Sequence, residues 1–401
     1  MKILWVKSDF LHPTDRGGQI RTLETLKQLH RRHSIHYVAL DVEGQPGGLE
    51  QSSEYCEKAY PIPHWAPPKN TAAFWLQTSA RLFSPLPLVI QRYRSNGMRR
   101  QIEALMRTEK FDSVVCDFLV AAPNFPDLSS AVLFQHNVEA LIWKRQAENA
   151  STLAHKLFFS DQYQRMRRFE AQVCRQVKSV IAVSAADAES MRSLYGVSRI
   201  AWVPTGVDIE YFSPPAQSAP VADLAFVGAM DWLPNIDGIK WFVDQILPLI
   251  RKRRPDCSLV IAGRRPMHGI QKLAEKDSRI RVTGTVPDVR PFLWGSRVSI
   301  VPLRSGSGTR LKIYEAMAAK IPIVSTAIGA EGLDIRDGED IHIADSPAAF
   351  AERCLALLED AAAGHRMADA AWCVVSSRYS WEVVSQKFEE LLTLGPATQQ
   401  R

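Results

Sequence analysis

The chain has 401 residues, of which 46% are apolar and 23% charged, and its formal net charge at pH 7 is +6. This length predicts two or three domains with cores of their own, and the composition excludes a low-complexity chain. The mild positive charge is compatible with an anionic partner such as a nucleotide or an acidic lipid surface. Because no homeodomain-like, zinc-finger or RNP-like pattern accompanies it, nucleic acid is not an expected partner.

Strand and helix patterns alternate from the N-terminus. Helical spacing of apolar residues covers 18–33, and a long helical region runs from Val138 to about Val177. Strands that alternate with helices in this way predict a parallel sheet covered on both faces. The expected strands of this half are KILWVKS (2–8), SIHYVALDV (34–42), FDSVVCDF (111–118), SAVLFQHN (130–137) and SVIAVS (179–184).

The alternation restarts after residues 203–222, a stretch rich in Pro, Ser and Gly that is the best linker in the chain. A helix is expected from about Asn235 to Arg253, and the run from Ser377 onward has the apolar spacing of an amphipathic helix that must dock on another surface. The further expected strands are 223–228, 258–263, 280–284, 298–303 and 321–326. We predict two α/β domains, 1–205 and 223–377, with a linker at 206–222 and a C-terminal helix at about 378–394.

Cysteine usage and apolar runs indicate the compartment. The six cysteines are scattered without a C-x-x-C pair, which favours reduced core thiols over zinc or a disulfide framework. The opening MKILWVKSDF is too short and too charged for a signal peptide, and no run approaches the ~18 apolar residues of a membrane span. We expect a cytoplasmic protein and leave open a peripheral contact with the inner face of the membrane.

The stretch RSGSGTRLKIYEAMA, residues 304–318, places a Gly/Ser turn, two cations and a glutamate at the head of an apolar helix. Free N–H groups and the dipole make a helix start an anion site, and glycines allow close approach. Arg310 and Lys312 can neutralise phosphates, and Glu315 is suited to accept hydrogen bonds from ribose hydroxyls. A plain turn with solvated cations and a surface glutamate is the alternative; the spacing favours the ligand site.

Two strand-end loops of the first domain are weaker candidates. Gly17 and Gly18 follow the first strand and precede a helix, but they form neither a G-x-G-x-x-G pattern nor a P-loop, and a helix entry turn explains them equally well. His136 ends an apolar strand, where it can donate a hydrogen bond or shuttle protons. A histidine simply satisfied at a strand end is the favoured explanation of His136 when it is taken alone.

The second domain offers three further strand ends. Gly228 and Gly263 would let a ligand approach, Arg264 could reach a phosphate, and the backbone at Thr285 and Val286 could read a base edge. No convincing Asp-x-Asp follows a strand, so no dedicated divalent-metal site is expected.

Basic clusters occur at 92–100, 165–168 and 251–254. The first, with aromatic and leucine residues nearby at 74–83, could rest on a membrane surface. A solvated face is the commoner explanation and is favoured.

In their order along the chain these motifs resemble the family-four retaining glycosyltransferases with the GT-B fold. The resemblance spans nearly the whole chain. The combination of FVGAMDWLPN with GSGTRLKIYEAMA looks like a subgroup linked to exopolysaccharide or cell-envelope assembly. The residues that carry the resemblance are Gly17-Gly18, His136-Asn137, VPTGVD (203–208), FVG (226–228), AGRRP (262–266), VTGTVPDV (282–289) and the EAMA that starts at Glu315.

The resemblance implies two Rossmann-like domains that face each other across a cleft, with the C-terminal helix crossing back to the first. It implies transfer of a hexose, with retention, from a UDP- or GDP-sugar to a glycan, lipid-linked or small-molecule acceptor, without a metal or another cofactor. No protein nucleophile is evident, so the leaving phosphate is expected to help deprotonate the acceptor. A non-catalytic nucleotide-sugar binding protein and a sugar-nucleotide epimerase of the same fold remain alternatives, which an acceptor-dependent transfer assay separates.

Roles follow from the resemblance position by position. His136 would sit beside the donor sugar and, with Glu315, form the catalytic pair; Glu315 would hold the donor ribose. Val286 would contact the base through its backbone, and residues 307–312 would hold the diphosphate together with Gly18. The implied donor-binding residues are Gly17, Gly18, Gly228, Arg264, Val286, Ser307, Gly308, Thr309, Arg310, Leu311, Lys312 and Glu315.

The chain departs from the family pattern at the usual cations. Ser307 replaces the first of two glutamates eight positions apart, Ala229 replaces an arginine, and the usual lysine is replaced near Pro234-Asn235. The expected substitutes for the missing cations are Arg310, Lys312 and Arg264.

Overall fold

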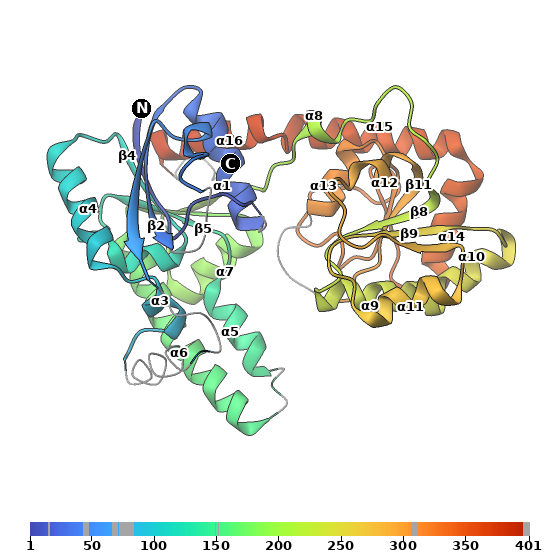
Figure 1. The fold of residues 1–401 in the computed structure, drawn as a ribbon, viewed down its shortest axis with the longest axis horizontal. Helices are drawn as coiled ribbons and strands as arrows, with labels where there is room; N and C mark the ends of the chain where they lie inside the picture. Colours follow the sequence, from blue (N-terminus) through green and yellow to red (C-terminus); the bar gives the residue numbers. More distant parts are fainter. Residues whose placement is uncertain are drawn as a thin grey trace. The chain divides into compact units, whose positions relative to one another are not determined.

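The computed structural model describes residues 1–14, 17–42, 48–65, 71, 84–148, 150, 152–305 and 311–395. The chain divides into two compact units, which are treated separately below (Figure 1). The N-terminal unit consists of Met1–Pro204 with Val384–Arg401, and the C-terminal unit is Thr205–Val383. The stretch 206–222, expected as a linker, belongs to the C-terminal unit. One contact that holds it there is the hydrogen bond that the Val207 amide donates to the Tyr379 carbonyl.

The N-terminal unit contains a parallel seven-stranded sheet in the order β3-β2-β1-β4-β5-β6-β7 among the described residues. β4 and β5 are buried along their whole length, as expected of strands covered on both faces. β3 has two prolines and lies at the edge, where their missing N–H groups are tolerated. The strands are β1 Lys2–Val6, β2 Ser34–Val42, β3 Lys58–His64, β4 Ser113–Asp117, β5 Ala131–Gln135, β6 Ser179–Ala182 and β7 Ile200–Trp202.

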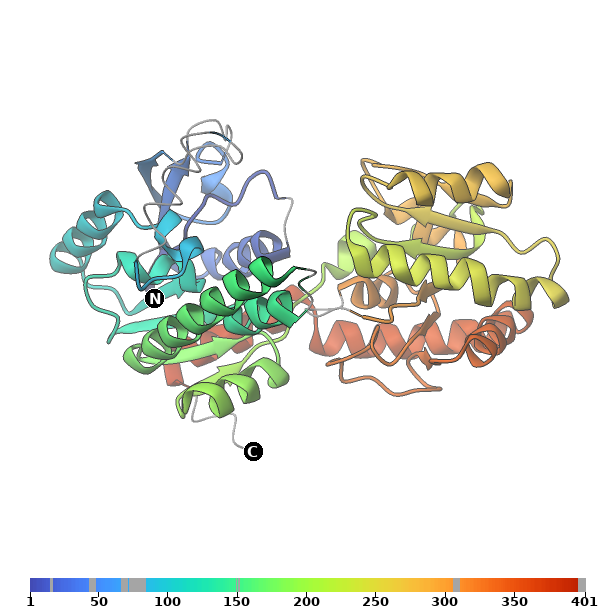
Figure 2. The same ribbon diagram turned by 90° about the horizontal axis from the view of Figure 1, so that it is seen from below.

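The helices of the N-terminal unit include a hairpin that the sequence pattern predicted as one long helix. That region breaks near residue 150, and α5 and α6 pack as a pair (Figure 2). The Thr152 side chain accepts a hydrogen bond from the His155 amide and so caps α6. The helices are α1 Gly17–His30, α3 Leu88–Arg92, α4 Asn96–Thr108, α5 Glu139–Glu148, α6 Leu153–Gln176 and α7 Ala185–Tyr195, with short 3₁₀ turns at Ser52–Glu54 and Leu119–Asn124.

The C-terminal unit repeats the plan with a parallel six-stranded sheet, in the order β10-β9-β8-β11-β12-β13 among the described residues. Helices α9 and α11 lie on one side of this sheet and α13 and α15 on the other (Figure 1). The strands are β8 Ala222–Val227, β9 Leu259–Ala262, β10 Ile280–Val282, β11 Ser296–Val301, β12 Ile323–Ser325 and β13 His342–Ile343.

The predicted helix from Asn235 to Arg253 contains a π-helical turn, η3, between α9 and α10. Pro248 follows it and has no N–H to donate, which explains the local change of hydrogen bonding. The helices of this unit are α8 Ile209–Phe212, α9 Leu233–Trp241, η3 Phe242–Ile246, α10 Leu247–Arg253, α11 His268–Lys276, α12 Arg290–Trp294, α13 Leu311–Ala318, α14 Pro347–Glu359 and α15 Ala361–Arg378.

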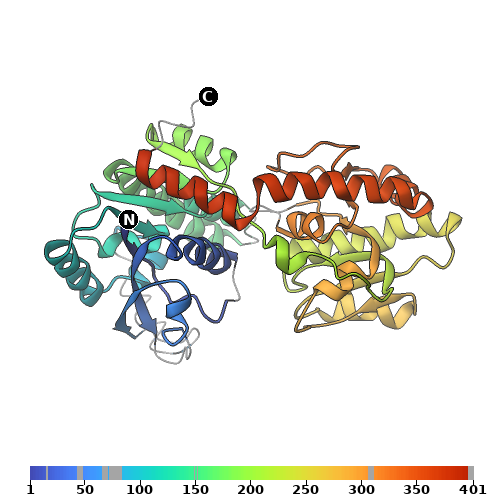
Figure 3. The ribbon, with the colours of Figure 1, turned by 90° about the horizontal axis from the view of Figure 1, so that it is seen from above.

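The last helix, α16 (Trp381–Leu394), returns the chain to the N-terminal unit and packs there (Figure 3). The Phe388 ring lies 5.6 Å from that of Trp5 and 4.8 Å from that of Phe134, measured between ring centroids. Glu389 pairs with Arg32 at 2.6 Å and with His33 at 3.0 Å. The apolar spacing that predicted a docking helix therefore matches a helix that closes the core beside β1 and β5.

Both sheets have one topological switch point, where neighbouring strands continue in opposite directions along the sheet. It lies between β1 and β4 in the N-terminal unit and between β8 and β11 in the C-terminal unit. In such sheets ligands bind beyond the carboxyl ends of the strands at this point. The residues that follow β1, β4, β8 and β11 are therefore the first candidates for ligand binding.

Candidate functional site

In the C-terminal unit, a lysine ammonium lies at the carboxyl end of β8. Lys312, in the first turn of α13, donates from Nζ to Oδ1 of Asn235 at 2.7 Å and lies 4.4 Å from the centroid of the Phe226 ring. The Asn235 amide in turn donates to the Ala229 carbonyl at 2.8 Å. The starts of α9 and α13 are thus tied to the end of β8 around one positive charge.

Gly228 makes this arrangement possible. A Cβ added there would lie 2.9 Å from Nζ of Lys312 and 2.9 Å from Nδ2 of Asn235. Any other residue would displace the ammonium or the amide, since real Cβ atoms do not approach so closely. The glycine that ends the FVG motif therefore holds the lysine side chain in place.

The loops after β8 and β9 are bonded to each other. The Gly228 amide donates to the Ala262 carbonyl at 3.0 Å, and the Met230 amide donates to the Arg264 carbonyl at 2.9 Å. The Arg264 side chain is about half exposed and lies 3.9 Å from Asp231. Arg264 therefore adds a second positive charge, close to the carboxylate of Asp231, in the loop after the neighbouring strand β9.

Glu315 lies one turn after Lys312 on α13 and is partly buried. Burial raises the pKa of its carboxyl to about 7, while the charge of Lys312 acts in the opposite direction. No described residue donates a hydrogen bond to this carboxylate. A half-buried acid without donors is costly for the fold, and a ligand with hydroxyl groups would supply what is missing.

The switch point of the N-terminal unit is organised around the buried Asp117 at the end of β4. Its carboxylate accepts hydrogen bonds from the Trp5 indole at 2.9 Å and the Thr22 hydroxyl at 2.7 Å. It also lies 3.1 Å from Lys7 Nζ and 2.8 Å from His136 Nε2. Burial alone would raise the pKa of Asp117, but Lys7 and His136 outweigh it and hold the pKa below its usual range. The group is a permanent anion at neutral pH.

His136 has a protein partner at each ring nitrogen. Nε2 faces Asp117, and Nδ1 lies 3.2 Å from a guanidinium nitrogen of Arg21. Because arginine can only donate, Nδ1 accepts, and the proton stays on Nε2. Burial lowers the pKa of His136 to about 3, so the ring is neutral at physiological pH. Donation to a sugar would require one of these contacts to break.

Phe118 completes the N-terminal network in a strained conformation. Its φ is +70°, a left-handed value that a bulky residue rarely adopts. The ring stacks on His136 with centroids 3.9 Å apart and lies under the Lys7 ammonium at 4.3 Å. A Cβ added to Gly18 would come within 2.8 Å of this ring. Packing against Phe118 therefore already accounts for the glycine at position 18.

Buried acids also lie at the start of α5, just after His136. Glu170 on α6 is fully buried and accepts hydrogen bonds from the backbone amides of Glu139 and Ala140, which caps α5 from a different helix. The Tyr195 hydroxyl adds a further donor at 2.6 Å. Burial, with Glu170 adding to it, raises the pKa of Glu139 to about 7. A carboxyl group with a raised pKa thus lies near the carboxyl end of β5.

Two family models match the two units in turn. Residues 16–211 match the model described as glycosyltransferase family 4, and residues 222–360 match the one described as glycosyl transferases group 1. The chain belongs to the group 1 glycosyltransferases. The resemblance drawn from the sequence motifs is confirmed at the level of family.

Individual proteins similar to this glycosyltransferase match it over nearly its whole length. An uncharacterised 44.6 kDa protein in the cps region of Klebsiella pneumoniae is 22% identical over 403 residues, which cover 97% of this chain and 99% of that protein. The structure of sucrose-phosphate synthase from Thermosynechococcus elongatus matches with a TM-score of 0.69 at 15% identity, over 98% of both chains. That of HepE from Anabaena in complex with UDP and glucose matches with a TM-score of 0.61 at 13% identity, over 98% and 100%. The predicted GT-B fold of two Rossmann-like units is confirmed.

In the C-terminal unit, the described residues that were predicted to bind the donor fall at the edge of the sheet where the strands have their carboxyl ends. Gly228, Arg264 and Val286 follow β8, β9 and β10, and Leu311 and Lys312 open α13 after β11. Gly17 opens α1 in the N-terminal unit, where a Cβ would meet no atom of the described chain within 4 Å. The predicted diphosphate residues Ser307, Gly308, Thr309 and Arg310 lie outside the described residues.

The sequence reasoning missed the partners of His136 in this glycosyltransferase. Asp117 carried a usable signal, because a polar residue ends an apolar strand there as it does at His136. Lys7 and Arg21 carried none, since their contact with Asp117 and His136 depends on the order of the strands.

Neither a cluster of metal ligands nor a membrane-spanning helix is present in the described part of the chain. It contains no group of three or more His, Cys, Asp or Glu side chains placed to hold a metal ion. None of its helices is both long enough and apolar enough to cross a membrane.

Proposed function

We propose that the chain transfers a hexose from a nucleotide-diphosphate sugar to an acceptor, with retention of configuration. The observation that carries the proposal is that Lys312 and Glu315 lie one turn apart on α13 at the switch point of the C-terminal sheet, and that Glu315 accepts no hydrogen bond from a described residue. An ammonium suits the diphosphate and a carboxylate without donors suits the ribose hydroxyls. A structural neighbour that binds UDP and glucose supports a nucleotide sugar as donor.

The position of Lys312 offers a reason why the departures from the family pattern are tolerated. The family's usual lysine is absent near Asn235, yet the Lys312 ammonium lies on the Asn235 side chain at 2.7 Å. A positive charge is thus supplied at the Asn235 side chain by a residue of α13 instead of α9. We propose that Lys312, with Arg264 nearby, neutralises the leaving diphosphate and takes the role that a metal ion has in other transferases.

The remaining roles are proposed from the same geometry. Val286 would face the base and Glu315 the ribose, and the leaving phosphate would help to deprotonate the acceptor. His136, held neutral by Asp117 and Arg21, would contribute as a positioned neighbour of the sugar and not as a proton carrier. No step then needs a protein nucleophile.

The acceptor is proposed to be a glycan or lipid-linked sugar in polysaccharide or cell-envelope synthesis, in the cytoplasm or at the cytoplasmic face of the membrane. The relative in a cps region, which the chain covers almost end to end, supports this setting. Peripheral contact with that membrane would bring the enzyme to a lipid-linked acceptor.

Thermal stabilisation by UDP, GDP, ADP and their sugars, followed by an acceptor-dependent transfer assay, tests the proposal. We expect one diphosphate and its sugar to raise the melting temperature, and the α-anomer of the donor to give an α-linked product. A chain that binds the donor but transfers nothing would be a binding protein. Conversion of the donor without acceptor would indicate an epimerase, and no stabilisation by any nucleotide would refute the donor site.

A further inference from the structure

The α5–α6 hairpin exposes apolar side chains close to its turn. The pair extends beyond the sheet of the N-terminal unit (Figure 1). Leu153 is 73% exposed and Leu157 63%, and Phe158 and Ile142 are 36% and 39% exposed. Exposed apolar groups that cluster at one end of a projecting element usually mark a surface that another body covers.

The exposed side of α6 changes character along its length. Leu153, Leu157, Gln164, Arg168 and Arg175 follow one another at spacings of four, seven, four and seven residues, which places them on one face of the helix. The first two turns of that face are apolar, and the later turns carry amides and guanidinium groups. At 1.5 Å per residue, about 16 Å separates Leu157 from Arg168.

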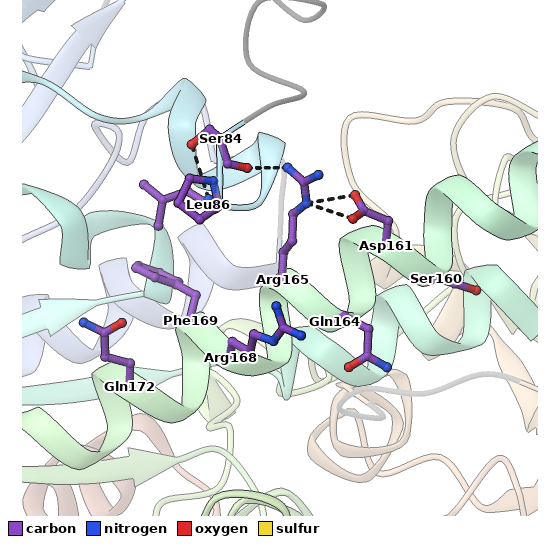
Figure 4. A pocket seen from close by; sticks show the side chains of 10 residues that line it. Ser84, Leu86, Ser160, Asp161, Gln164, Arg165, Arg168, Phe169 and Gln172 are labelled. Atoms are coloured by element: carbon purple, nitrogen blue, oxygen red, sulfur yellow. Dashed lines mark hydrogen bonds and ion pairs between the residues drawn. The ribbon is translucent and has the colours of Figure 1, made fainter.

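Shallow grooves flank this face on both sides. One, of about 730 Å³, lies between α6 and residues 84–86 (Figure 4). The other, of about 600 Å³, opens toward Leu194. Gln164, Arg168 and Gln172 line both grooves. The ridge of α6 therefore offers hydrogen-bond donors to either side.

The arginines of this ridge are not equally engaged. Arg165 is held by Asp161 and by the carbonyl of Ser84. Arg167 and Arg168 form no hydrogen bond or ion pair within the described chain. Two guanidinium groups are thus available to anions outside the protein.

The charge of the hairpin is positive where it is exposed. α5 and α6 contain seven Lys or Arg residues and four Asp or Glu residues. Two of the four acids lie at the base of the hairpin, where Glu170 is fully buried and Glu139 is partly buried. Lys144, Arg145 and Lys156 are exposed on the same two helices, and of these Lys144 lies 3.8 Å from Glu148.

We propose that the exposed face of α6, from Leu153 to Arg175, binds the surface of an anionic lipid bilayer. Leucines at one end would enter the boundary between headgroups and acyl chains, to a depth of about 5–10 Å, and the arginines would contact lipid phosphates. A second copy of the chain is a poorer partner, because a two-fold interface would bring one cationic face against another. The inference rests on the membrane contact proposed above and names the surface that makes it, while vesicle binding itself requires neither donor nor acceptor.

Vesicle co-sedimentation of the full chain tests this surface. The probes are phosphatidylcholine vesicles and vesicles in which about a third of the lipid is phosphatidylglycerol. We expect the wild type to partition onto the anionic vesicles and to be released by salt. We expect the double substitution Leu153→Asp/Leu157→Asp to lower the partition coefficient at least about tenfold, because two exposed leucines no longer enter the interface.

Matched variants separate this surface from general effects. Leu49→Asp removes a leucine that is 42% exposed elsewhere on the same unit, and it should leave binding within about twofold of the wild type. Arg167→Glu/Arg168→Glu should remove most of the preference for anionic lipid. The charge-matched change Lys252→Glu/Lys272→Glu on the C-terminal unit should retain most of it.

Three outcomes would overturn the inference. They are failure of the wild type to bind anionic vesicles at low salt, equal binding by the leucine double variant and Leu49→Asp, and self-association that the leucine double variant abolishes. Nucleotide-induced thermal stabilisation, measured on the same variants, should stay at the wild-type level. Loss of vesicle binding with intact donor binding would therefore count against this surface alone and not against the proposed function.

Discussion

The two switch points of the molecule have the same topology but opposite chemistry. In the N-terminal unit, Asp117 is surrounded by donors and cations from β1, α1 and β5, and each charge there finds its partner inside the protein. In the C-terminal unit, Glu315 has no donor among the described residues, and its pKa is raised to about 7. Similar strand order therefore does not distribute the binding chemistry evenly: the charges of the first site are paired within its own unit, and the second site keeps a carboxylate without a hydrogen-bond donor among the described residues.

The largest effect is expected from Asp117→Ala, which breaks the closed network. It leaves Lys7 without its buried counter-ion and removes the acceptor of His136, so we expect the N-terminal unit to lose about 3–5 kcal/mol of stability. Differential scanning calorimetry should show the N-terminal unit unfolding at a lower temperature, while the unfolding temperature of the C-terminal unit is unchanged. A variant with an unchanged melting profile would show that the network does not support the fold.

Glu315→Gln should act in the opposite sense on stability. The carboxyl has a pKa of about 7 in the folded chain and an ordinary value of 4.5 when unfolded, so the folded state holds the proton more tightly. The free energy of unfolding of the wild type therefore falls as pH rises from about 4.5 to 7, and the variant lacks that fall. At pH 8 the variant should be more stable by up to about 3 kcal/mol, and the gain should vanish near pH 4.5.

Glu315→Gln should also bind a donor more weakly, because the carboxylate that destabilises the fold at high pH is the group proposed to accept hydrogen bonds from the ribose. Melting temperatures at pH 5 and pH 8, with and without nucleotide, check both parts. Glu275→Gln changes an exposed glutamate of the same unit and serves as control. A gain that is equal at both pH values would mean that Glu315 is not the titrating group.

Lys312→Met should weaken binding of the nucleoside diphosphate by about 1.5–3 kcal/mol, because a charge-assisted contact to phosphate is lost. Binding of the nucleoside alone should change little. Calorimetric titration of both ligands gives the two affinities. Lys320→Met removes a lysine just beyond the other end of α13 and should leave both unchanged. Equal losses for nucleoside and diphosphate would contradict a phosphate role.

The smallest effect is expected from the pair of glycines at the start of α1. Gly18→Ala brings a methyl group to 2.8 Å from the Phe118 ring and should cost about 1–2 kcal/mol through overpacking. Gly17→Ala has open space and should be neutral or slightly stabilising. Chemical denaturation of both variants provides the comparison. If Gly18→Ala matched Gly17→Ala in stability, the packing explanation for Gly18 would be wrong.

Sequence patterns predicted the parts of the fold that local physics decides. Continuous apolar strands such as β4 and β5 were recognised because both of their faces are buried. β3 was missed because Lys58–His64 contains two prolines, which only its edge position accommodates. The break between α5 and α6 was missed because apolar spacing continues on both sides of it.

The candidate site, like the fold, could be predicted only in part from the sequence. Gly228, Lys312 and Glu315 stood out because small, cationic and acidic residues follow strands and open a helix in the right order. The contact between Lys312 and Asn235 could not be foreseen, since it joins residues 77 positions apart through the packing of two helices. The neutral state of His136 could not be foreseen either, because burial and the Arg21 contact set it.

The central claim is that the donor diphosphate binds at the C-terminal switch point. Hydrogen–deuterium exchange of the full chain with and without its preferred nucleoside diphosphate tests it most directly. We expect slower exchange in peptides that cover 226–235 and 311–318, with little change in 113–124. Protection confined to the N-terminal network, or absent from 226–235 and 311–318, would contradict it.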